Sequence, residues 1–186
     1  INSRDTAWVL VSAALVLLMT PGLAFFYGGM VRVKSVLNMM MMSFAAIAVV
    51  SVIWVIYGYS LAFGDSGSQW IGTFSLSSLS DVVNEVTANG AYYPIPTLAF
   101  AAFQLMFAII TPALISGAIA DRAKFTTWVI FIAVWVSIVY FPVAHWVFDF
   151  GNSTTDGAGW LAGQGVLDFA GGTAVHINAG AAGLAL

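Results

Sequence analysis

Long apolar segments alternate with short polar connections along the chain. A helix needs about 20 mostly apolar residues to cross the hydrocarbon core of a bilayer. Five segments meet this requirement, at roughly Thr6–Tyr27, Val36–Phe63, Pro96–Ala120, Thr126–Phe148 and Val166–Leu186. The pattern predicts an all-α, polytopic membrane protein with five transmembrane helices.

The connections between these segments differ in charge. Arg32 and Lys34 follow the first span, and Arg122 and Lys124 follow the third, whereas the second and fourth connections contain acidic residues and no Lys or Arg. Because cytoplasmic loops carry an excess of cations, the first and third connections are predicted to be cytoplasmic. The N-terminus is then expected outside the cell membrane, and only Arg4 departs from this pattern.

The composition agrees with a protein that lies in a bilayer. Apolar residues make up 61% of the 186 residues, charged residues make up 7%, and the mean hydropathy is +0.96. The net charge is −3 and no basic run is present, which argues against a nucleic-acid partner. The chain has no cysteine, and we expect neither a metal site nor a cofactor. No nucleophile and base stand in a recognisable pattern, so an enzyme is the least favoured class.

An odd number of spans has a consequence for the whole protein. A second copy of this unit would enter the membrane from the opposite side and would produce an inverted repeat with a site near the midplane. The chain begins at Ile1 and stops at Leu186 within an apolar run. We therefore expect both ends to be truncations or processing points, and residues 1–186 to be an incomplete N-terminal repeat.

His176 is the most informative polar residue in the predicted spans. It follows Asp168 by eight positions, about 12 Å along a helix, which predicts a site near the bilayer centre. A neutral imidazole can donate at one nitrogen and accept at the other, which suits a hydrogen-bonding solute. Alternatively, the ring is fixed to a backbone carbonyl, and both interpretations stand. Helical spacing predicts small residues on its face: Gly172, Thr173, Ala179, Gly180 and Gly183.

Asp168 lies near the N-terminal end of the fifth predicted helix. A carboxylate there can cap exposed N–H groups, and it can also attract cations to the mouth of a pore. Capping is the first interpretation, and the two roles are compatible. About 80° of helical rotation separates Asp168 from His176, which argues against a direct proton relay between them.

Aromatic side chains could also hold a cation. Phe103 and Phe107 lie one turn apart on the third span, and Trp146 and Phe148 lie at the end of the fourth. Such residues mostly pack or face lipid, although an aromatic face can bind a cation. For His145 beside them, an anchoring or buried structural role is the preferred interpretation.

Prolines are expected to disturb three of the predicted spans. Pro112 and Pro142 remove helical hydrogen bonds and are expected to kink the third and fourth spans. Pro21 and Gly22 are expected to make the end of the first span irregular.

Several motifs resemble those of the ammonium transporter (Amt/Mep/Rh) family. The run from Asp168 to Asn178 (DFAGGTAVHIN) looks like the fifth-helix signature of that family, and the run from Pro21 to Gly29 (PGLAFFYGG) resembles the first-helix motif. The pair Phe103-Gln104 with Phe107, and the segment from Gly117 to Arg122, extend the likeness over essentially the whole chain.

The resemblance implies a complete fold and a transport mechanism. Family members have eleven transmembrane helices, built from two inverted five-helix repeats and a last helix, and they form homotrimers. Ammonium is recruited at an outer aromatic site, passes stacked phenylalanines and loses its proton on the way. Ammonia and the proton then cross an apolar pore lined by two histidines. A cytoplasmic PII-type protein is a possible regulator.

By resemblance, several residues take roles in this path. His176 is the first pore histidine, Phe107 is the gate with Phe103 as its outer neighbour, and Asp168 supports the recruitment site formed with Phe107. The resemblance also implies that Phe26 and Tyr27 line the inner pore.

Two features of the family pattern are absent from the chain. The tryptophan of the outer site corresponds to Phe148 here, with Trp146 and Trp160 as nearby substitutes. The second histidine, the second gate phenylalanine and the outer-site serine belong to the other half of the family fold.

The alternatives to transport are an ammonium sensor with a cytoplasmic signalling tail and an Rh-type gas channel.

Overall fold

The computed structural model is a bundle of helices that run along one long axis. It describes residues 1–64, 68–80, 82–83, 85–86, 94–151 and 159–186. The α-helices are α1 (Ser3–Met30), α2 (Val36–Ile53), α3 (Tyr59–Phe63), α4 (Thr97–Ile115), α5 (Phe125–Trp135), α6 (Phe141–Phe148) and α7 (Asn178–Ala185). Stretches of π-helix occupy Trp54–Gly58, Val136–Tyr140 and Gly172–Ile177, and 3-10 turns occupy Val33–Ser35, Ser77–Leu79, Ser116–Ile119 and Ala162–Gln164. Among the described residues, β-structure is limited to a bridge between Val86 and Pro96.

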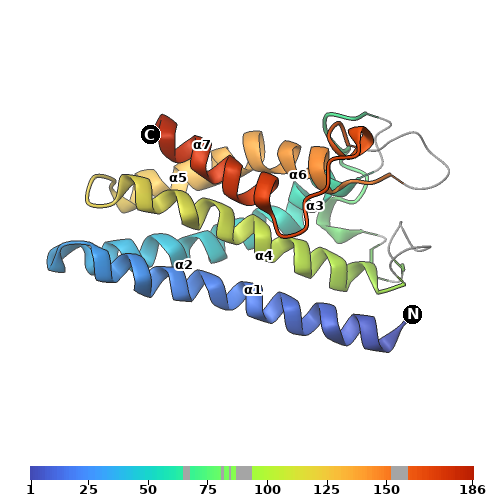
Figure 1. The fold of residues 1–186 in the computed structure, drawn as a ribbon, viewed down its shortest axis with the longest axis horizontal. Helices are drawn as coiled ribbons and strands as arrows, with labels where there is room; N and C mark the ends of the chain where they lie inside the picture. The colour runs from blue at the N-terminus through green and yellow to red at the C-terminus, as the bar shows by residue number, and fades with distance from the viewer. Residues whose placement is uncertain (65–67, 81, 84, 87–93, 152–158) are drawn as a thin grey trace.

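The predicted all-α membrane fold is confirmed. Four helical segments of the described chain are long and apolar enough to cross a membrane: Ser3–Met30, Val33–Phe63, Thr97–Ile119 and Phe125–Phe148. They match the first four predicted spans within a few residues. The short turns from α1 to α2 and from α4 to α5 lie at one end of the bundle, and the N-terminus lies at the other (Figure 1).

The fifth predicted span begins later than expected. Residues 166–171 are not helical, and the helix starts with the π-stretch at Gly172 and continues as α7. Gly171 has φ of +77°, a conformation that favours glycine, and a Cβ there would lie 2.9 Å from Val175. The expected start at Val166 is therefore wrong by six residues, because the backbone turns sharply at Gly171.

The α1 helix continues through its proline. The expected irregularity after Pro21 is not present, since α1 is helical to Met30. Likewise α4 continues past Pro112 to Ile115. In the fourth span, Pro142 follows the π-stretch Val136–Tyr140, so the helix there does change its geometry next to a proline.

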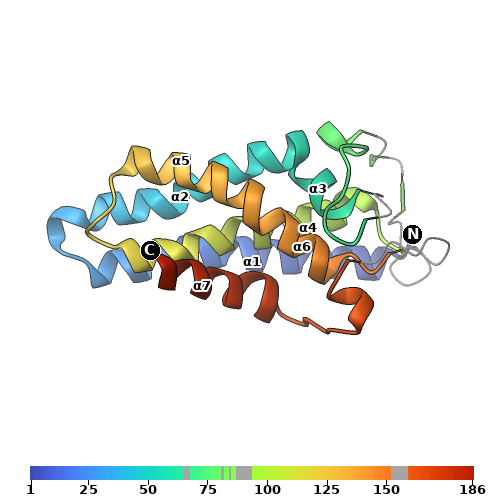
Figure 2. The ribbon, with the colours of Figure 1, turned by 90° about the horizontal axis from the view of Figure 1, so that it is seen from above.

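α1 packs against α2 and α4, α2 also packs against α5, and α7 lies against α4 at one side of the bundle (Figure 2). Two buried indoles tie these helices together. Trp54 Nε1 donates to the carbonyl of Ala101 at 3.1 Å, and Trp128 Nε1 donates to the carbonyl of Met42 at 2.8 Å. A buried donor without a partner is costly, so these bonds fix how α2 faces α4 and α5.

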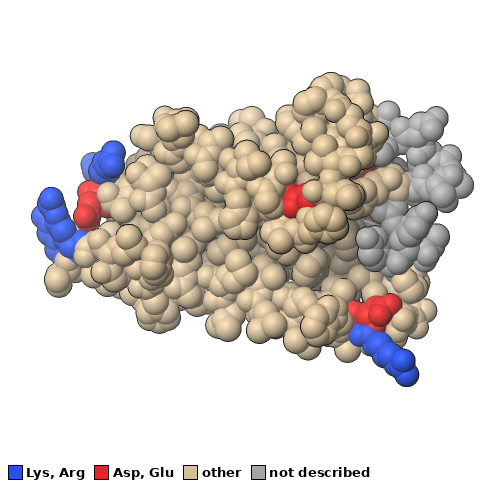
Figure 3. All heavy atoms as spheres, viewed as in Figure 1, with Lys and Arg blue, Asp and Glu red and all other residues tan. Residues whose placement is uncertain are grey.

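The charged side chains lie mainly at the two ends of the molecule. Lys and Arg gather at the end with the short turns, and one basic side chain lies at the opposite end beside acidic atoms (Figure 3). The long flank between the ends is almost entirely uncharged in this view. This distribution is that of a multi-pass membrane protein.

The π-stretch of the second span packs tightly against the fourth span. A Cβ on Gly58 would lie 2.5 Å from Cζ of Phe141, a fully buried ring that also contacts Trp54 and Tyr57. Because the ring is fully buried, an added methyl group at position 58 must displace it within the core. The close approach of these two spans therefore depends on glycine at position 58.

We predict that Gly58→Ala destabilises the protein by about 1–3 kcal/mol through overpacking. Thermal unfolding of the full-length protein in detergent would measure the loss. Gly29→Ala is the matched control, since no atom lies within 4 Å of the added carbon in the described structure. Equal melting temperatures for the two variants would contradict this account of the packing.

Candidate functional site

Two pockets lie on either side of Phe107. The large pocket, of about 420 Å³, is lined by residues that include Phe103, Gln104, Phe107, Phe148 and Asp168. The small pocket, of about 280 Å³, is lined by ten residues: Met19, Gly22, Leu23, Phe26, Phe107, Ile110, Leu114, Ala170, Val175 and His176. Phe107 and Ala170 line both, so they form the wall between the two spaces.

The phenylalanines of α4 face the large pocket because of their helical spacing. Phe103 and Phe107 are one turn apart, and their rings meet edge to face at a centroid distance of 4.9 Å. Phe100 and Gln104 line the same pocket, which extends the face of α4 along the helix. Thr111 Oγ1 donates to the carbonyl of Phe107 at 2.6 Å, one turn further on.

Asp168 caps the helix that carries His176. Its Oδ1 accepts the N–H of Gly172 at 2.7 Å, and its Oδ2 accepts the N–H groups of Thr173 and Ala174 at 2.9 and 3.0 Å. The capping role predicted for Asp168 is confirmed. The carboxylate also lines the large pocket, so it adds negative charge beside the phenyl rings.

His176 lies in the small pocket and is fixed by a backbone carbonyl. Its Nδ1 is 3.0 Å from the carbonyl oxygen of Gly171, which also accepts the backbone N–H of His176 at 3.0 Å. Because a carbonyl only accepts, Nδ1 carries the proton, and Nε2 of the neutral ring is left as an acceptor. The contact with a backbone carbonyl that one sequence interpretation expects is therefore confirmed. The ring also lines a cavity, and its contact with a passing solute stays a prediction.

The surroundings of His176 differ from those expected on a regular helix. The expected small-residue face does not line the small pocket; α1 and α4 supply most of its wall. The π-stretch changes the helical spacing around His176, and the non-helical segment before Gly172 removes the regular 12 Å offset from Asp168. Asp168 and His176 bind different backbone groups, which agrees with the absence of a direct relay between them.

The two expected inner-pore residues of α1 point in different directions. Phe26 lines the small pocket and is 61% exposed in this chain. Tyr27 instead packs between α1 and α4, where its hydroxyl donates to the carbonyl of Leu114 at 3.1 Å and its ring lies against Gly117. The structure thus separates Tyr27 from the pocket, because a residue next to Phe26 faces another side of the helix.

Trp146 and Phe148, which the sequence places together at the end of the fourth span, lie in different surroundings. Phe148 lines the large pocket, whereas Trp146 is not among its lining residues. The indole N–H of Trp146 donates to the carbonyl of Trp70 at 2.7 Å, and its ring packs against Trp70 and Trp160 at centroid distances of 6.0 and 5.6 Å. Of the two, Phe148 is the residue that contributes an aromatic face to the pocket.

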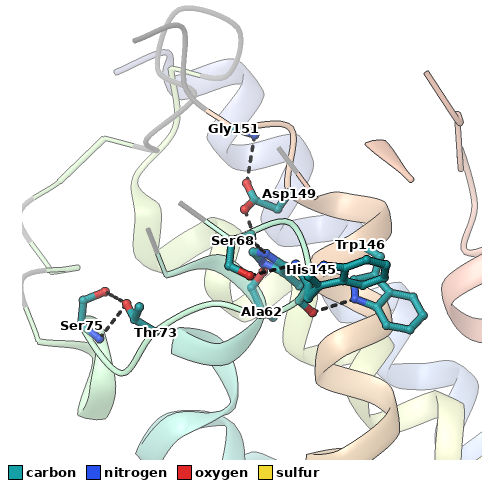
Figure 4. A network of polar contacts seen from close by, with 9 residues as sticks. Ala62, Ser68, Thr73, Ser75, His145, Trp146, Asp149 and Gly151 are labelled. Atoms are coloured by element: carbon teal, nitrogen blue, oxygen red, sulfur yellow. Dashed lines mark hydrogen bonds and ion pairs between the residues drawn. The ribbon is translucent and has the colours of Figure 1, made fainter. Parts of the chain in front are cut away.

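His145 has the buried structural role that its position predicts. The side chain is fully buried, with Nδ1 3.0 Å from the carbonyl of Ala62 and Nε2 2.9 Å from the carbonyl of Ser68 (Figure 4). Asp149 lies 3.4 Å from Nδ1. These contacts join the ends of α3 and α6 to the segment that begins at Ser68, and they hold Phe148 and Asp149 in place.

Nearly every residue of the segment 68–73 forms a hydrogen bond through its backbone to another part of the chain. The carbonyl of Gln69 accepts the N–H of Trp160 at 2.9 Å, and Gly72 donates to the carbonyl of Leu61 at 2.8 Å. The carbonyl of Thr73 accepts the hydroxyl of Ser60 at 2.6 Å. We call residues 68–73 the fastened segment.

Other members of the large pocket were not singled out from the sequence. They include Tyr59, Phe63, Glu85, Thr97 and Phe100. Thr97, Phe100, Gln104 and Phe107 follow one another at helical spacing, so the pattern contained a signal for part of this set. Glu85 lies in an irregular connection, where spacing gives no indication of its neighbours.

Comparison with known proteins identifies a family for this arrangement. Residues 7–186 match the model of the Ammonium Transporter Family. An ammonium transporter of Mycobacterium tuberculosis (strain ATCC 25618 / H37Rv) is 57% identical over 199 residues, which cover 100% of this chain and 42% of that protein. An ammonium transporter of Bacillus subtilis (strain 168) is 48% identical over 183 residues, covering 98% of this chain and 42% of that protein.

Solved structures of similar proteins share the fold. The crystal structure of Saccharomyces cerevisiae Mep2 superposes with a TM-score of 0.86 at 35% identity, covering 99% of this chain and 39% of that one. A sensor Amt protein gives a TM-score of 0.77 at 29% identity, covering 92% of this chain and 40% of that one. The chain thus spans about two fifths of the length of these relatives.

We predict that Asp168→Ala lowers the free energy of unfolding by about 1–3 kcal/mol, because three backbone N–H groups lose a charged acceptor. Asp168→Asn retains one acceptor oxygen and is expected to show a smaller loss. Denaturation of the full-length protein would rank the variants. Asp121→Asn is a control for loss of a carboxylate elsewhere, since asparagine tolerates the φ of +64° at that position. If the Ala and Asn variants of Asp168 matched the unmodified protein, the capping bonds would contribute nothing to stability.

Proposed function

The chain belongs to the ammonium transporter family, and on this basis we propose that it carries ammonium across a cell membrane. One observation carries the proposal: Phe107, together with Ala170, forms the wall between a pocket with an acidic and aromatic lining and a pocket that contains His176. The first environment suits a cation, and the second suits a neutral molecule that forms hydrogen bonds.

In the proposed mechanism, the large pocket recruits the ammonium ion. Phe107 and Phe148 present aromatic faces, each able to hold a cation by about 0.5–2 kcal/mol. The carboxylate of Asp168 adds an attractive field from the end of its helix, while its oxygens are held by backbone N–H groups. Phe103 flanks the recruited ion beside Phe107.

The ion then dissociates into ammonia and a proton, which cross the apolar part of the path as separate species, and ammonia passes Phe107. Apart from His176, the side chains that line the small pocket carry no nitrogen or oxygen, so a charged ion would lose its hydration there without compensation. Neutral ammonia can donate an N–H to Nε2 of His176, which is the ring atom left as acceptor by the Gly171 bond. Phe26 lines the next part of the path.

We further propose the setting in which this unit works. Residues 1–186 form the N-terminal repeat of an eleven-helix transporter, and the second pore histidine lies in the other repeat. The end with Arg32, Lys34, Arg122 and Lys124 faces the cytoplasm, so the N-terminus is outside. The transporter assembles as a homotrimer in the plasma membrane, with a PII-type protein as a possible cytoplasmic regulator.

A sensor is the second candidate function. The similarity to a sensor Amt protein over 92% of the chain favours it, since the same fold is present in that protein. In a sensor, occupation of the large pocket would change a signalling segment without supporting flux. Uptake measurements with the purified protein in liposomes separate the two, because a sensor would bind ammonium without carrying it.

We predict that His176→Leu in the full-length protein reduces ammonium uptake by more than about tenfold, since the apolar part of the path loses its hydrogen-bonding partner. Growth on limiting ammonium, or current in liposomes, would measure it. Ile177→Leu, a change at the adjacent exposed position, serves as the control for expression and folding. Unchanged uptake in the His176 variant would remove this residue from the mechanism.

We also predict that Phe148→Trp lowers the half-saturating ammonium concentration by about twofold to fivefold, because an indole binds cations more strongly than a phenyl ring. The concentration dependence of the transport current is the measurement. Trp146→Phe is the matched reverse change outside the pocket, and we expect it to leave the half-saturating concentration unaltered. If only the Trp146 change altered the half-saturating concentration, the aromatic role would belong to Trp146 and the assignment to Phe148 would be wrong.

A further inference from the structure

The connection after the second span turns back along that span. The hydroxyl of Ser60, a fully buried residue of α3, donates to the carbonyl of Thr73 at 2.6 Å and accepts the N–H of Leu76 at 2.8 Å. The 3-10 turn that follows packs against the π-stretch Trp54–Gly58, which precedes α3 in the span. We call residues 73–80 the returning segment, and it lies beside α3 (Figure 2).

One ring of the returning segment lies exposed against the span. Phe74 packs on Tyr57 with ring centroids 6.5 Å apart, and it is 66% exposed. Tyr57 is fixed in turn by its hydroxyl, which lies 2.7 Å from Oγ of Ser137 in the fourth span. The connection therefore holds an apolar ring beside the second span, and not beyond its end.

The depth of Phe74 follows from the length of the second span. Asn38 lies at the level of the basic connections, since its Nδ2 donates to the carbonyl of Ala123, next to Lys124, at 3.4 Å. Tyr57 belongs to the same continuous helical span. The nineteen steps from position 38 to position 57 cover about 28 Å along a helix, and the hydrocarbon core is about 30 Å thick. Phe74 thus lies at the edge of the core opposite the basic end.

Hydroxyl groups of the returning segment bond to the segment itself. Thr73 Oγ1 donates to Oγ of Ser75 at 3.0 Å. The hydroxyls of Ser77 and Ser80 donate to the carbonyls of Phe74 and Ser77 at 2.8 and 2.9 Å. Where lipid replaces water, polar groups need such partners from the protein. The segment is therefore built for an environment in which water is scarce.

Tryptophan side chains lie one level further from the core. Ala62 follows Tyr57 by five positions, about 8 Å along a helix, and its carbonyl contacts His145, next to Trp146. Trp70 packs against Trp146 and is 50% exposed. The headgroup layer occupies this depth, and tryptophan is enriched there because its ring is both apolar and able to hydrogen-bond.

We propose that the returning segment and Trp70 form an interfacial anchor, in which Phe74 inserts among the acyl chains at the edge of the bilayer and Trp70 lies in the headgroup layer. The partner is the phospholipid of the leaflet opposite the basic end. It is recognised through its apolar chains and not through its charge, since residues 68–80 contain no charged side chain.

The anchor goes beyond the proposed transport and has a consequence for the large pocket. The fastened segment joins the returning segment to His145, whose ring contacts the carbonyl of Ser68. His145 precedes Phe148 by one helical turn, and Phe148 lines the pocket. Contact with lipid at Phe74 therefore helps to fix the depth of this part of the pocket wall.

A spin label reports the depth of Phe74 in the full-length protein, reconstituted in liposomes of phosphatidylcholine and phosphatidylglycerol. Phe74→Cys carries the label, after any cysteine outside residues 1–186 is replaced by serine, since these residues contain none. Lys34→Cys gives the aqueous reference, and a phospholipid with a nitroxide near the ester end of its acyl chain gives the reference for the edge of the core. We expect the label at position 74 to collide with a polar nickel chelate at least about threefold less often than the label at position 34, because polar solutes enter the core poorly. Its collisions with oxygen should match those of the labelled lipid.

Two results of this measurement would overturn the anchor. Collisions with the nickel chelate as frequent as at position 34 would place the returning segment in water. Few collisions with either reagent would show that protein covers Phe74, whether a second copy or another part of the chain.

A second measurement keeps an aromatic ring at the position. Phe74→Trp adds one indole, whose emission is the difference between the variant and the unmodified protein in the same liposomes. Phospholipid brominated near the ester end of its acyl chain is expected to reduce this added emission by at least about twofold, because the indole lies at the interface. Quenching by aqueous iodide alone, or by neither reagent, would contradict the anchor. Neither measurement uses ammonium uptake, so a failure of the anchor and a failure of the proposed transport are distinguishable.

Discussion

Within the hydrocarbon core there is no water to hydrogen-bond with the protein, so a buried polar group is costly unless a partner in the chain satisfies it. The buried indoles of Trp54 and Trp128 donate to carbonyls of neighbouring helices, and both nitrogens of His145 contact carbonyls. Asp168 satisfies three N–H groups at the start of the last helix. These bonds help to fix the positions of α2, α4, α6 and the π-stretch before α7.

The same requirement gives the two pockets their different character. Where the chain supplies carboxylates, at Asp168, Asp149 and Glu85, the large pocket favours positive charge. Past Phe107, the ring of His176 is the polar side chain among those that line the small pocket, and the Gly171 carbonyl determines which of its nitrogens can accept a hydrogen bond. Phe107 and Ala170 therefore separate a pocket lined by carboxylates and aromatic rings from a pocket lined by His176 and apolar side chains.

The sequence predicted the features that depend on composition and local chemistry. Hydropathy identified the first four spans, because the length of an apolar run determines whether it can cross a bilayer. The capping role of Asp168 and the buried role of His145 followed from their places at helix ends. The late start of the last helix was missed because residues 166–171 are mostly apolar, while the turn depends on the backbone of Gly171. The directions of Tyr27 and Trp146, and the approach of Glu85 to Thr97, depend on tertiary contacts that spacing does not contain.

The fastened segment, residues 68–73, has a consequence for the evolution and engineering of this protein. Surface connections usually tolerate insertions and deletions. Here backbone groups of five of the six residues are hydrogen-bonded to His145, Trp146, Trp160, Leu61 and Ser60. One added or removed residue would therefore put this series of bonds out of register. The length of this stretch should consequently vary little among homologues that keep these contacts, and a reporter peptide inserted there would disturb the wall that holds Phe148.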